Sequence, residues 1–523
     1  MKKRHVQVTL LAISLATAPA LLAQETVGSP SPAASEAPPP AASVPPETAP
    51  PAAAAGLVRP VPPLLPTAMA SPPAAPHPAP APSSGHVSTK FDATFYGFIE
   101  LDSIYDSTQS FTDVAGGSSI QRPGTYGNSN GRTTFGVRNS RLGFKLTGPE
   151  TENLKTSGIF EMDFLGNQPQ SSPVVVAPQS GGGSTGIKAV STGAPTVSEA
   201  SYFTSPTFRI RHAALKLATP IVDILAGQYW SLFGWQSMFH PNTVEIQGVP
   251  GEIYARTPQV RLSHVFDTGP AAVEVAVAAG RPAQRDSKTP DGMGGLRFML
   301  NDWKALHTGG ATGTAVDPLS VGVSGIVRRF RVPEFTDTPV SSLTLNGWGV
   351  SVDALLPVIP AKSSKDGNAL TLTGSFIYGR GIADLYTGFN GGAFTPTLPS
   401  GNPFTAQDVD NGLVVYDANA VLHAIYWRSF IVGAQYYLPL PARVWVSGNY
   451  SHMNSNNINT LSGNSSSATT KIFDKEDWAD GNLLYAANDA VRFGLEYAWF
   501  RQTYLDGVKA SDKRLQFSAF YVF

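Results

Sequence analysis

The sequence predicts an all-β protein, a transmembrane antiparallel β-barrel of about sixteen strands preceded by a signal peptide and a disordered Pro/Ala-rich segment. Three observations support this fold class: strand-length segments with period-2 alternation, connections that alternate between short and long, and a chain end of alternating aromatic residues. A soluble β-sandwich shares the first pattern. The other two are typical of outer-membrane barrels, which have tight turns at one end and large loops at the other.

Alternation of side chains runs through the chain from residue 91 onward. In 273–278, for example, Val273, Val275 and Val277 are apolar and are separated by smaller or charged residues. The segments 141–147 and 492–499 show the same alternation. Successive side chains of a strand face opposite sides, so each segment has one apolar and one polar or small face. The expected strands are 93–106, 133–147, 156–166, 206–218, 221–231, 255–267, 270–281, 293–304, 318–331, 343–356, 368–381, 425–438, 443–453, 479–487, 490–502 and 513–523.

The connections between these segments alternate in length. The short ones are 219–220, 267–270, 439–442 and 488–489, and the long ones are 107–131, 167–205, 232–254, 382–412 and 454–477. The stretch 413–427 is open to two interpretations, as an extension of a strand or as part of a loop. At the chain end, alternating residues lead to Tyr521 and Phe523, which resembles the C-terminal assembly signature of bacterial outer-membrane proteins.

The first ninety residues differ from the rest. Residues 1–23 have the charged start, short apolar stretch and small residues of a cleaved signal peptide, which implies export. Residues 24–89 contain 19 of the 44 prolines and predict a disordered periplasmic spacer that could contact peptidoglycan or a periplasmic protein. The barrel domain is expected over 90–523, in the bacterial outer membrane and surrounded by its lipid.

Composition excludes several classes of function. The chain has no Cys and a formal net charge of −1, which argues against thiolate chemistry and nucleic-acid binding. The pattern G-x-G-x-x-G at Gly181, Gly183 and Gly186 lies in a Gly/Ser-rich loop rather than between a strand and a helix, so it does not indicate a nucleotide site. The nine His lack metal-binding spacing. We therefore expect no cofactor, no metal and no catalytic residue.

If the apolar faces meet lipid, the alternate positions meet a water-filled lumen, because a charge facing lipid near mid-membrane costs about 2–4 kcal/mol for Arg or Lys. The cationic residues expected to line the pore are Arg138, Arg141, Lys145, Arg209, Arg211, Arg261 and Arg297, and the acidic ones are Glu100, Asp102, Glu161 and Asp163. Acid–base pairs should brace the wall, and unpaired guanidinium groups should favour anions.

The segment 232–254 follows the fifth expected strand. Its position suits a loop that folds into the pore and narrows it, although a surface loop is the alternative. As residues of this constriction loop we expect Trp235, Phe239, His240 and Glu245.

Five stretches, taken in order, resemble DcaP-like outer-membrane porins. They are Phe95-Tyr-Gly-Phe-Ile-Glu-Leu-Asp102, Asn139-Ser-Arg-Leu-Gly-Phe-Lys145, Phe160-Glu-Met-Asp-Phe164, Phe208-Arg-Ile-Arg-His-Ala213 and Ala226-Gly-Gln-Tyr-Trp-Ser-Leu-Phe233. The resemblance implies a trimeric, sixteen-stranded channel for passive uptake of small, preferentially anionic solutes such as dicarboxylates, with Arg138, Arg141, Arg209, Arg211 and Arg261 lining the pore. A departure is the proline-rich tract, which cannot form the coiled-coil-like extension expected of such proteins.

The sequence therefore predicts a porin for small anionic solutes and not an enzyme. One alternative is a structural barrel whose proline-rich arm tethers the membrane to the cell wall. Another is an outer-membrane hydrolase, which would require an Asp–His or Ser–His pair close together at the rim.

Overall fold

The computed structural model describes residues 91–115, 119–166, 199–284, 287–308, 314–334, 340–361, 363, 367–387, 412–417, 421–439, 443–461 and 472–523. The expected signal peptide, the Pro/Ala-rich spacer and the glycine motif at 181–186 lie outside the described residues.

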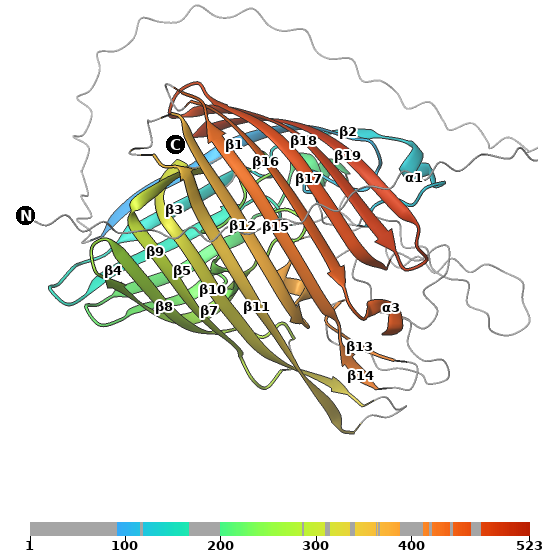
Figure 1. Cartoon of the computed structure of the whole chain (residues 1–523), viewed down its shortest axis with the longest axis horizontal. Coiled ribbons are helices and arrows are strands. Elements are labelled where there is room, and N and C mark those ends of the chain that lie inside the picture. The colour runs from blue at the N-terminus through green and yellow to red at the C-terminus, as the bar shows by residue number, and fades with distance from the viewer. Residues whose placement is uncertain are drawn as a thin grey trace, which may run out of the picture. The chain divides into compact units, whose positions relative to one another are not determined.

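The described chain forms one closed antiparallel barrel, shown from the side in Figure 1. The first strand, β1 (Asp92–Asp106), pairs with the last, β19 (Lys509–Val522), which removes the free edges of the sheet. Between them β2 (Arg132–Gly136) and β3 (Arg141–Thr147) share one position, so the wall has sixteen strands, as predicted. The others are β4 (Lys155–Asp163), β5 (Arg209–Ala218), β6 (Asp223–Trp230), β7 (Arg256–Asp267), β8 (Ala271–Gly280), β9 (Asp291–Thr308), β10 (Thr314–Pro333), β11 (Ser342–Ile359), β12 (Ala369–Arg380), β15 (Tyr426–Tyr437), β16 (Val444–Ser455), β17 (Phe473–Ala486) and β18 (Val491–Tyr504).

The structure corrects three expected boundaries. The segment 133–147 is not one strand, because a turn at 137–140 separates β2 from β3 and folds polar side chains inward. The strand expected at 479–487 begins at Phe473. The ambiguous stretch 413–427 forms a separate hairpin of β13 (Val414–Tyr416) and β14 (Leu422–Ala424) before β15.

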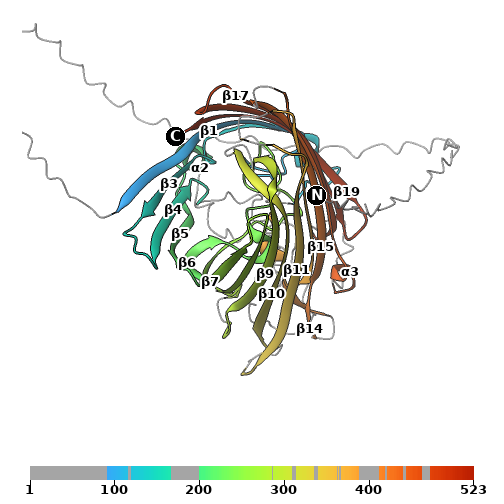
Figure 2. The same cartoon turned by 60° about the vertical axis from the view of Figure 1, so that its left-hand side comes forward.

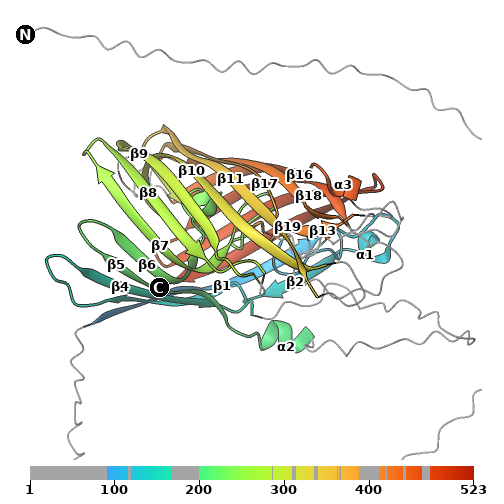
Figure 3. The ribbon, with the colours of Figure 1, turned by 90° about the horizontal axis from the view of Figure 1, so that it is seen from below.

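The two ends of the barrel differ. Hairpin turns gather at one end, here called the turn end, where β1 starts and β19 finishes. The longer connections gather at the other, the loop end, together with the short helices α1 (Tyr126–Ser129) and α3 (Ile458–Leu461) (Figure 3). A third short helix is α2 (Glu199–Thr204), and two 3₁₀ turns are η1 (Phe233–Trp235) and η2 (Ala383–Leu385). Among the described residues, no helix is both long and apolar enough to cross a membrane.

Burial follows the alternation of the sequence. In β1, Glu100, Asp102 and Ile104 are 0 to 1% exposed, whereas Leu101 and Tyr105 are 48% and 52% exposed. Directly paired residues of neighbouring strands share a face, so the register carries this assignment around the wall. Apolar side chains cover the outer face, and polar side chains face the interior. Figure 2 shows the ring of strands, with β3–β7 on one side and β11–β19 on the other.

Close backbone packing between β5 and β6 requires a glycine. Gly227 has φ +129°, and a Cβ built there would lie 2.2 Å from the carbonyl oxygen of Ala213. We predict that Gly227→Ala lowers the free energy of unfolding by about 1–3 kcal/mol, the usual cost of a strained backbone position. Urea unfolding in detergent, followed by tryptophan fluorescence, measures the change. The matched control is Gly481→Ala, because a Cβ at Gly481 meets no atom within 4 Å. Equal stability of the two variants would contradict the prediction.

Candidate functional site

The segment between β6 and β7, residues 231–255, crosses the interior of the barrel, and we call it the crossing loop. It begins against β9 and β10, where the indole N–H of Trp235 donates to the carbonyl oxygen of Val323 (3.1 Å). The ring lies on two glycines, since a Cβ at Gly295 or Gly322 would come within 2.8 Å or 2.7 Å of it. Small residues on these strands therefore make room for the loop.

The crossing loop then reaches strands that lie far from it in sequence. The side-chain oxygen of Asn242 accepts a hydrogen bond from the indole N–H of Trp445 on β16 (2.9 Å). The backbone amides of Val244 and Glu245 both donate to the carboxylate of Glu496 on β18, at 2.8 Å and 3.0 Å. Hydroxyls of β15 and β16 hold its return, since Ser429 donates to the carbonyl oxygen of Gly251 and Ser451 to that of Pro250.

The four residues expected in a constriction loop lie in this segment, and all are packed. Trp235 and Phe239 are 3% exposed, His240 5% and Glu245 0%. His240 contacts Glu252 of the same loop. Burial raises the pKa of Glu245 to about 8, although Arg514 of β19 opposes the shift. These side chains hold the loop in place rather than facing open space.

Carboxylates on the β1 and β17–β19 side of the interior are covered. Glu100, Asp102, Glu496 and Asp512 face inward yet are 0 to 1% exposed. The crossing loop lies over Glu496, and the connection between β1 and β2 lies over Asp512, whose carboxylate accepts a hydrogen bond from the amide of Thr108 (2.9 Å). The predicted pore-lining acids Glu100 and Asp102 are thus on the inner face but shielded from solution.

Arg138, which lies in the turn between β2 and β3, is also covered by other segments of the chain. Its side chain is fully buried, forms an ion pair with Asp113 (2.8 Å), and stacks over the ring of Tyr202 with its guanidinium carbon 3.5 Å from the centroid. Arg138 therefore braces the connection from β1 to the wall.

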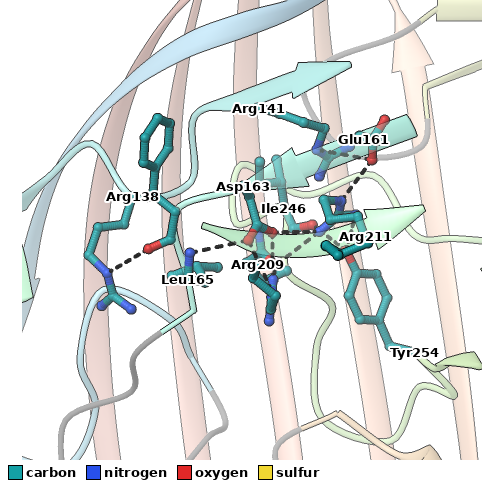
Figure 4. A network of polar contacts seen from close by, with 12 residues as sticks. Arg138, Arg141, Glu161, Asp163, Leu165, Arg209, Arg211, Ile246 and Tyr254 are labelled. Atoms are coloured by element: carbon teal, nitrogen blue, oxygen red, sulfur yellow. Dashed lines mark hydrogen bonds and ion pairs between the residues drawn. The ribbon is translucent and has the colours of Figure 1, made fainter. Parts of the chain in front are cut away.

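The β3–β5 side carries the densest group of charges (Figure 4). Arg209 and Arg211 lie two residues apart on β5 and both point inward, and a bulge at Arg211 also turns the next residue, His212, to the inner face opposite Glu161. Asp163 receives Arg209 (2.6 Å) and Arg211 (3.0 Å), and Glu161 receives Arg211 (2.8 Å) and lies 3.6 Å from Arg141. Three guanidinium groups thus share two carboxylates, which leaves the group positive.

The crossing loop adds two hydrogen-bond acceptors to this cluster. Gln247 accepts a hydrogen bond from Arg209 (2.8 Å), and the Tyr254 hydroxyl accepts one from Arg211 (3.2 Å). Arg256 at the start of β7 lies over the rings of Trp230 and Tyr254. Burial alone would raise the pKa of Tyr254, but the nearby guanidinium groups of Arg211 and Arg256 lower it to about 8. The shift reports a strongly positive local potential.

Toward the turn end, the basic side chains on the inner face of the barrel become more exposed. Lys145 on β3 is exposed, Arg261 on β7 is half-buried, and Arg297 on β9 pairs with Glu274 (2.5 Å). Lys216 on β5 keeps 48% of its side chain exposed beside Asp223. Arg261 donates to Gln259 and to the Trp230 carbonyl, and no ion pair joins it to a carboxylate among the described residues. The accessible charges here are mainly cationic.

Two basic residues of this region were not predicted. Lys216 could have been found, because it alternates with Leu215 and Leu217 in the expected strand 206–218. Arg256 has no such signal, since it is out of phase with the inward Arg261 and joins the cluster only through contacts with the crossing loop.

The chain end lies at the barrel seam. The amide and carbonyl groups of Phe523 exchange two hydrogen bonds of 3.0 Å with Gly97 of β1, and its ring stacks on Phe95 with centroids 5.1 Å apart. Tyr521 pairs with Ile99 and is 54% exposed on the outer face. An assembly role for Tyr521 and Phe523 stays a prediction.

Histidine–carboxylate pairs occur near the loop end. His423 lies 2.9 Å from Asp417 in the β13–β14 hairpin, and His452 lies 2.8 Å from Asp477. Within the described part of the chain, neither ring hydrogen-bonds a serine or threonine hydroxyl.

The buried position of Arg211 makes it sensitive to substitution. We predict that Arg211→Met lowers the free energy of unfolding by about 3–5 kcal/mol, because it removes the buried guanidinium group that donates hydrogen bonds to both Glu161 and Asp163. Urea unfolding measures the change. The control Lys216→Met removes a half-exposed partner of Asp223 and should cost less than about 1 kcal/mol. If Arg211→Met lowers the free energy of unfolding no more than Lys216→Met does, the buried ion-pair role of Arg211 is contradicted.

The lowered pKa of Tyr254 has a direct spectroscopic consequence. Ultraviolet absorbance of tyrosinate should rise with a midpoint near pH 8 in the native protein and lose that phase in Tyr254→Phe. Since the folded-state pKa lies below the ordinary 10, the stabilisation is complete above pH 10 and is lost as pH falls through 8. Relative to Tyr254→Phe, the native protein should thus gain up to about 3 kcal/mol of stability between these values. A midpoint near pH 10 would contradict the positive potential.

No protein-family model and no curated protein matches the sequence. Among solved structures, the outer-membrane channel DcaP of Acinetobacter baumannii is similar over 83% of this chain and 97% of that one, with 19% identity and a TM-score of 0.54. An anion-selective porin from Comamonas acidovorans aligns over 83% of this chain and 100% of that one, with 12% identity and a TM-score of 0.47. The resemblance seen in the sequence is thus confirmed at the level of the backbone, and the chain has the sixteen-stranded barrel fold of DcaP-like outer-membrane porins.

Proposed function

We propose that this chain is an outer-membrane porin, a water-filled channel for passive diffusion of small hydrophilic solutes with a preference for anions of the dicarboxylate class. The observation that carries the proposal is that loops bury the acidic side chains of the interior but leave several basic ones exposed. Inward carboxylates near β1 and β17–β19 are buried under loops, whereas Lys145, Lys216 and Arg261 on the β3–β7 side remain accessible. A solute passing through would meet mainly positive charge, which favours anions.

The chemistry of the accessible groups suits carboxylates. Guanidinium groups present paired N–H donors that match the two oxygens of a carboxylate, and they remain charged at any physiological pH. Arg141 and Arg209 lie at the edge of the cluster, with 15% and 32% of their side chains exposed. Arg261, Lys145 and Lys216 extend the cationic surface toward the turn end. A solute with two carboxylates could exchange one contact for the next along this row.

The crossing loop sets the width of the path in this proposal. It occupies the interior from β9 to β18, so solutes would pass between the loop and the β3–β9 wall. Diffusion down a gradient needs no cofactor or energy source. We infer transport rather than hydrolysis because the described residues present accessible guanidinium groups inside the barrel but no activated nucleophile at its rim.

The outer face supports a membrane location and an assembly. Apolar side chains exposed on the isolated barrel match a lipid-facing band, and we place the turn end in the periplasm. At the loop end of the shorter strands, Phe135, Phe208 and Ile210 are 51 to 64% exposed. These residues suit contact with another subunit, and we propose the homotrimer that the family resemblance implies.

Single-channel recording in planar bilayers tests the proposal. We expect a preference for chloride over potassium, and Arg261→Gln combined with Lys145→Gln should lower that permeability ratio by about twofold or more, because accessible positive charge is removed. Neither substitution leaves a carboxylate without its ion-pair partner among the described residues. The control Lys513→Gln removes a charge from the outer face and should leave the reversal potential unchanged. Cation selectivity of the native channel would overturn the anion preference, and the absence of conductance would overturn the porin.

A further inference from the structure

Basic side chains recur on the outer face of the barrel near the loop end. We call them the basic belt: Arg329 on β10, Arg380 on β12, Arg428 on β15, Lys475 on β17, Arg501 on β18 and Lys513 on β19. The register places them outward, because Arg380 pairs with the outward Trp348 and Arg501 pairs with the outward Ser511. All are exposed or half-buried on the barrel. None of them belongs to the interior site described above.

An aromatic layer lies directly below the belt. Tyr378 is two residues from Arg380, Phe430 two from Arg428, and Trp499 two from Arg501. Residues two apart share a face and are separated by about 6–7 Å along the strand. Below this layer the outer face is apolar, with Val432 and Leu495 52% and 44% exposed. Aromatic side chains are enriched at membrane interfaces, so the belt would lie at the headgroup level of the leaflet on the loop side.

The described residues around the belt neutralise only part of its charge. Arg428 donates to Asn454 (2.7 Å) and Arg380 to the Tyr426 hydroxyl (3.4 Å), and within the described residues neither forms an ion pair. An acid does occur in the belt: Asp477 receives Arg501 (2.8 Å) and His452 (2.8 Å). Among the described residues, the six basic side chains of the belt thus outnumber the acids beside them, Asp474 and Asp477.

A groove between β9 and β12 gives this surface a shape as well as a charge. It has a volume of about 590 Å³ and is lined by Val327, Arg329, Asn346, Trp348 and Arg380 among others. Its apolar lining comes from Val327 and Trp348, and its cationic lining from Arg329 and Arg380. This combination fits a ligand with both an acyl or sugar portion and an anionic group.

The other side of the barrel shows a different pattern. There the outer face stays apolar up to the loop end, at Phe135, Phe208 and Ile210. The belt therefore lies on the taller strands, away from the side that suits a neighbouring subunit, where lipid would remain in contact with the barrel.

We propose that the basic belt binds the phosphate groups of a phosphorylated glycolipid in the leaflet on the loop side, with the groove between β9 and β12 as the best-formed position. The inference rests on the proposed outer-membrane location but not on conduction or its selectivity. The electrostatic attraction of several basic side chains to one anionic headgroup adds up, so the belt should favour a phosphorylated lipid over its dephosphorylated form.

Native mass spectrometry of the full-length protein in detergent with added diphosphoryl lipid A tests the proposal. The variant Arg380→Gln/Arg428→Gln/Lys513→Gln should retain this lipid at least about tenfold less than the native protein, which corresponds to about 1.4 kcal/mol of binding free energy. The matched control is Lys155→Gln/Lys304→Gln/Arg443→Gln, which removes three exposed charges at or near the turn end and should bind as the native protein does. Dephosphorylated lipid A should bind all three proteins equally weakly.

Equal loss in both triple variants, or equal binding of the phosphorylated and dephosphorylated lipids, would overturn the proposal. Heat-dependent gel mobility verifies that each variant is folded. Conductance measured on the same preparations separates the two proposals. A native protein that binds the phosphorylated lipid but does not conduct would overturn the porin proposal and support the lipid site. A native protein that conducts but shows no phosphate-dependent binding would overturn the lipid site and support the porin proposal.

Discussion

Two backbone amides of the crossing loop donate to the carboxylate of Glu496, and the arrangement of the interior depends on this contact. Glu496 is 1% exposed, so the bonds form where water does not compete and are stronger than they would be in water. They hold the loop against β17 and β18. As a result the loop covers one side of the interior and leaves the other side open.

The crossing loop also joins the two electrostatic regions of the barrel. Its Glu245 faces the buried carboxylates and Arg514, whereas its Gln247 and Tyr254 contact Arg209 and Arg211. Burial of like charges would be costly if they stayed ionised, which accounts for the raised pKa of Glu245, whereas the surplus of guanidinium groups accounts for the lowered pKa of Tyr254. One segment thus separates shielded acids from accessible bases, and the proposed anion preference follows from that separation.

The barrel wall uses charge differently on its two faces. Inside, Glu161 and Asp163 hold the network of Arg141, Arg209 and Arg211, and a bulge at Arg211 adds His212 to the same face. Outside, Asp477 forms an ion pair with one member of the basic belt, and the belt lies above aromatic side chains. The same residue types therefore fix geometry in the interior, and on the exterior we propose that they bind phosphate.

The sequence by itself determined the barrel, its sixteen strands and the inward face of the predicted charges, because a two-residue period fixes side-chain direction locally. It also placed the crossing loop between the correct strands. Tertiary structure decided which of those charges meet solution. Glu100 and Asp102 alternate as regularly as Lys145 does, yet segments distant in the chain cover the first two and not the third. The turn at 137–140, the bulge at Arg211 and the recruitment of Arg256 likewise depend on contacts between distant residues, which no local pattern encodes.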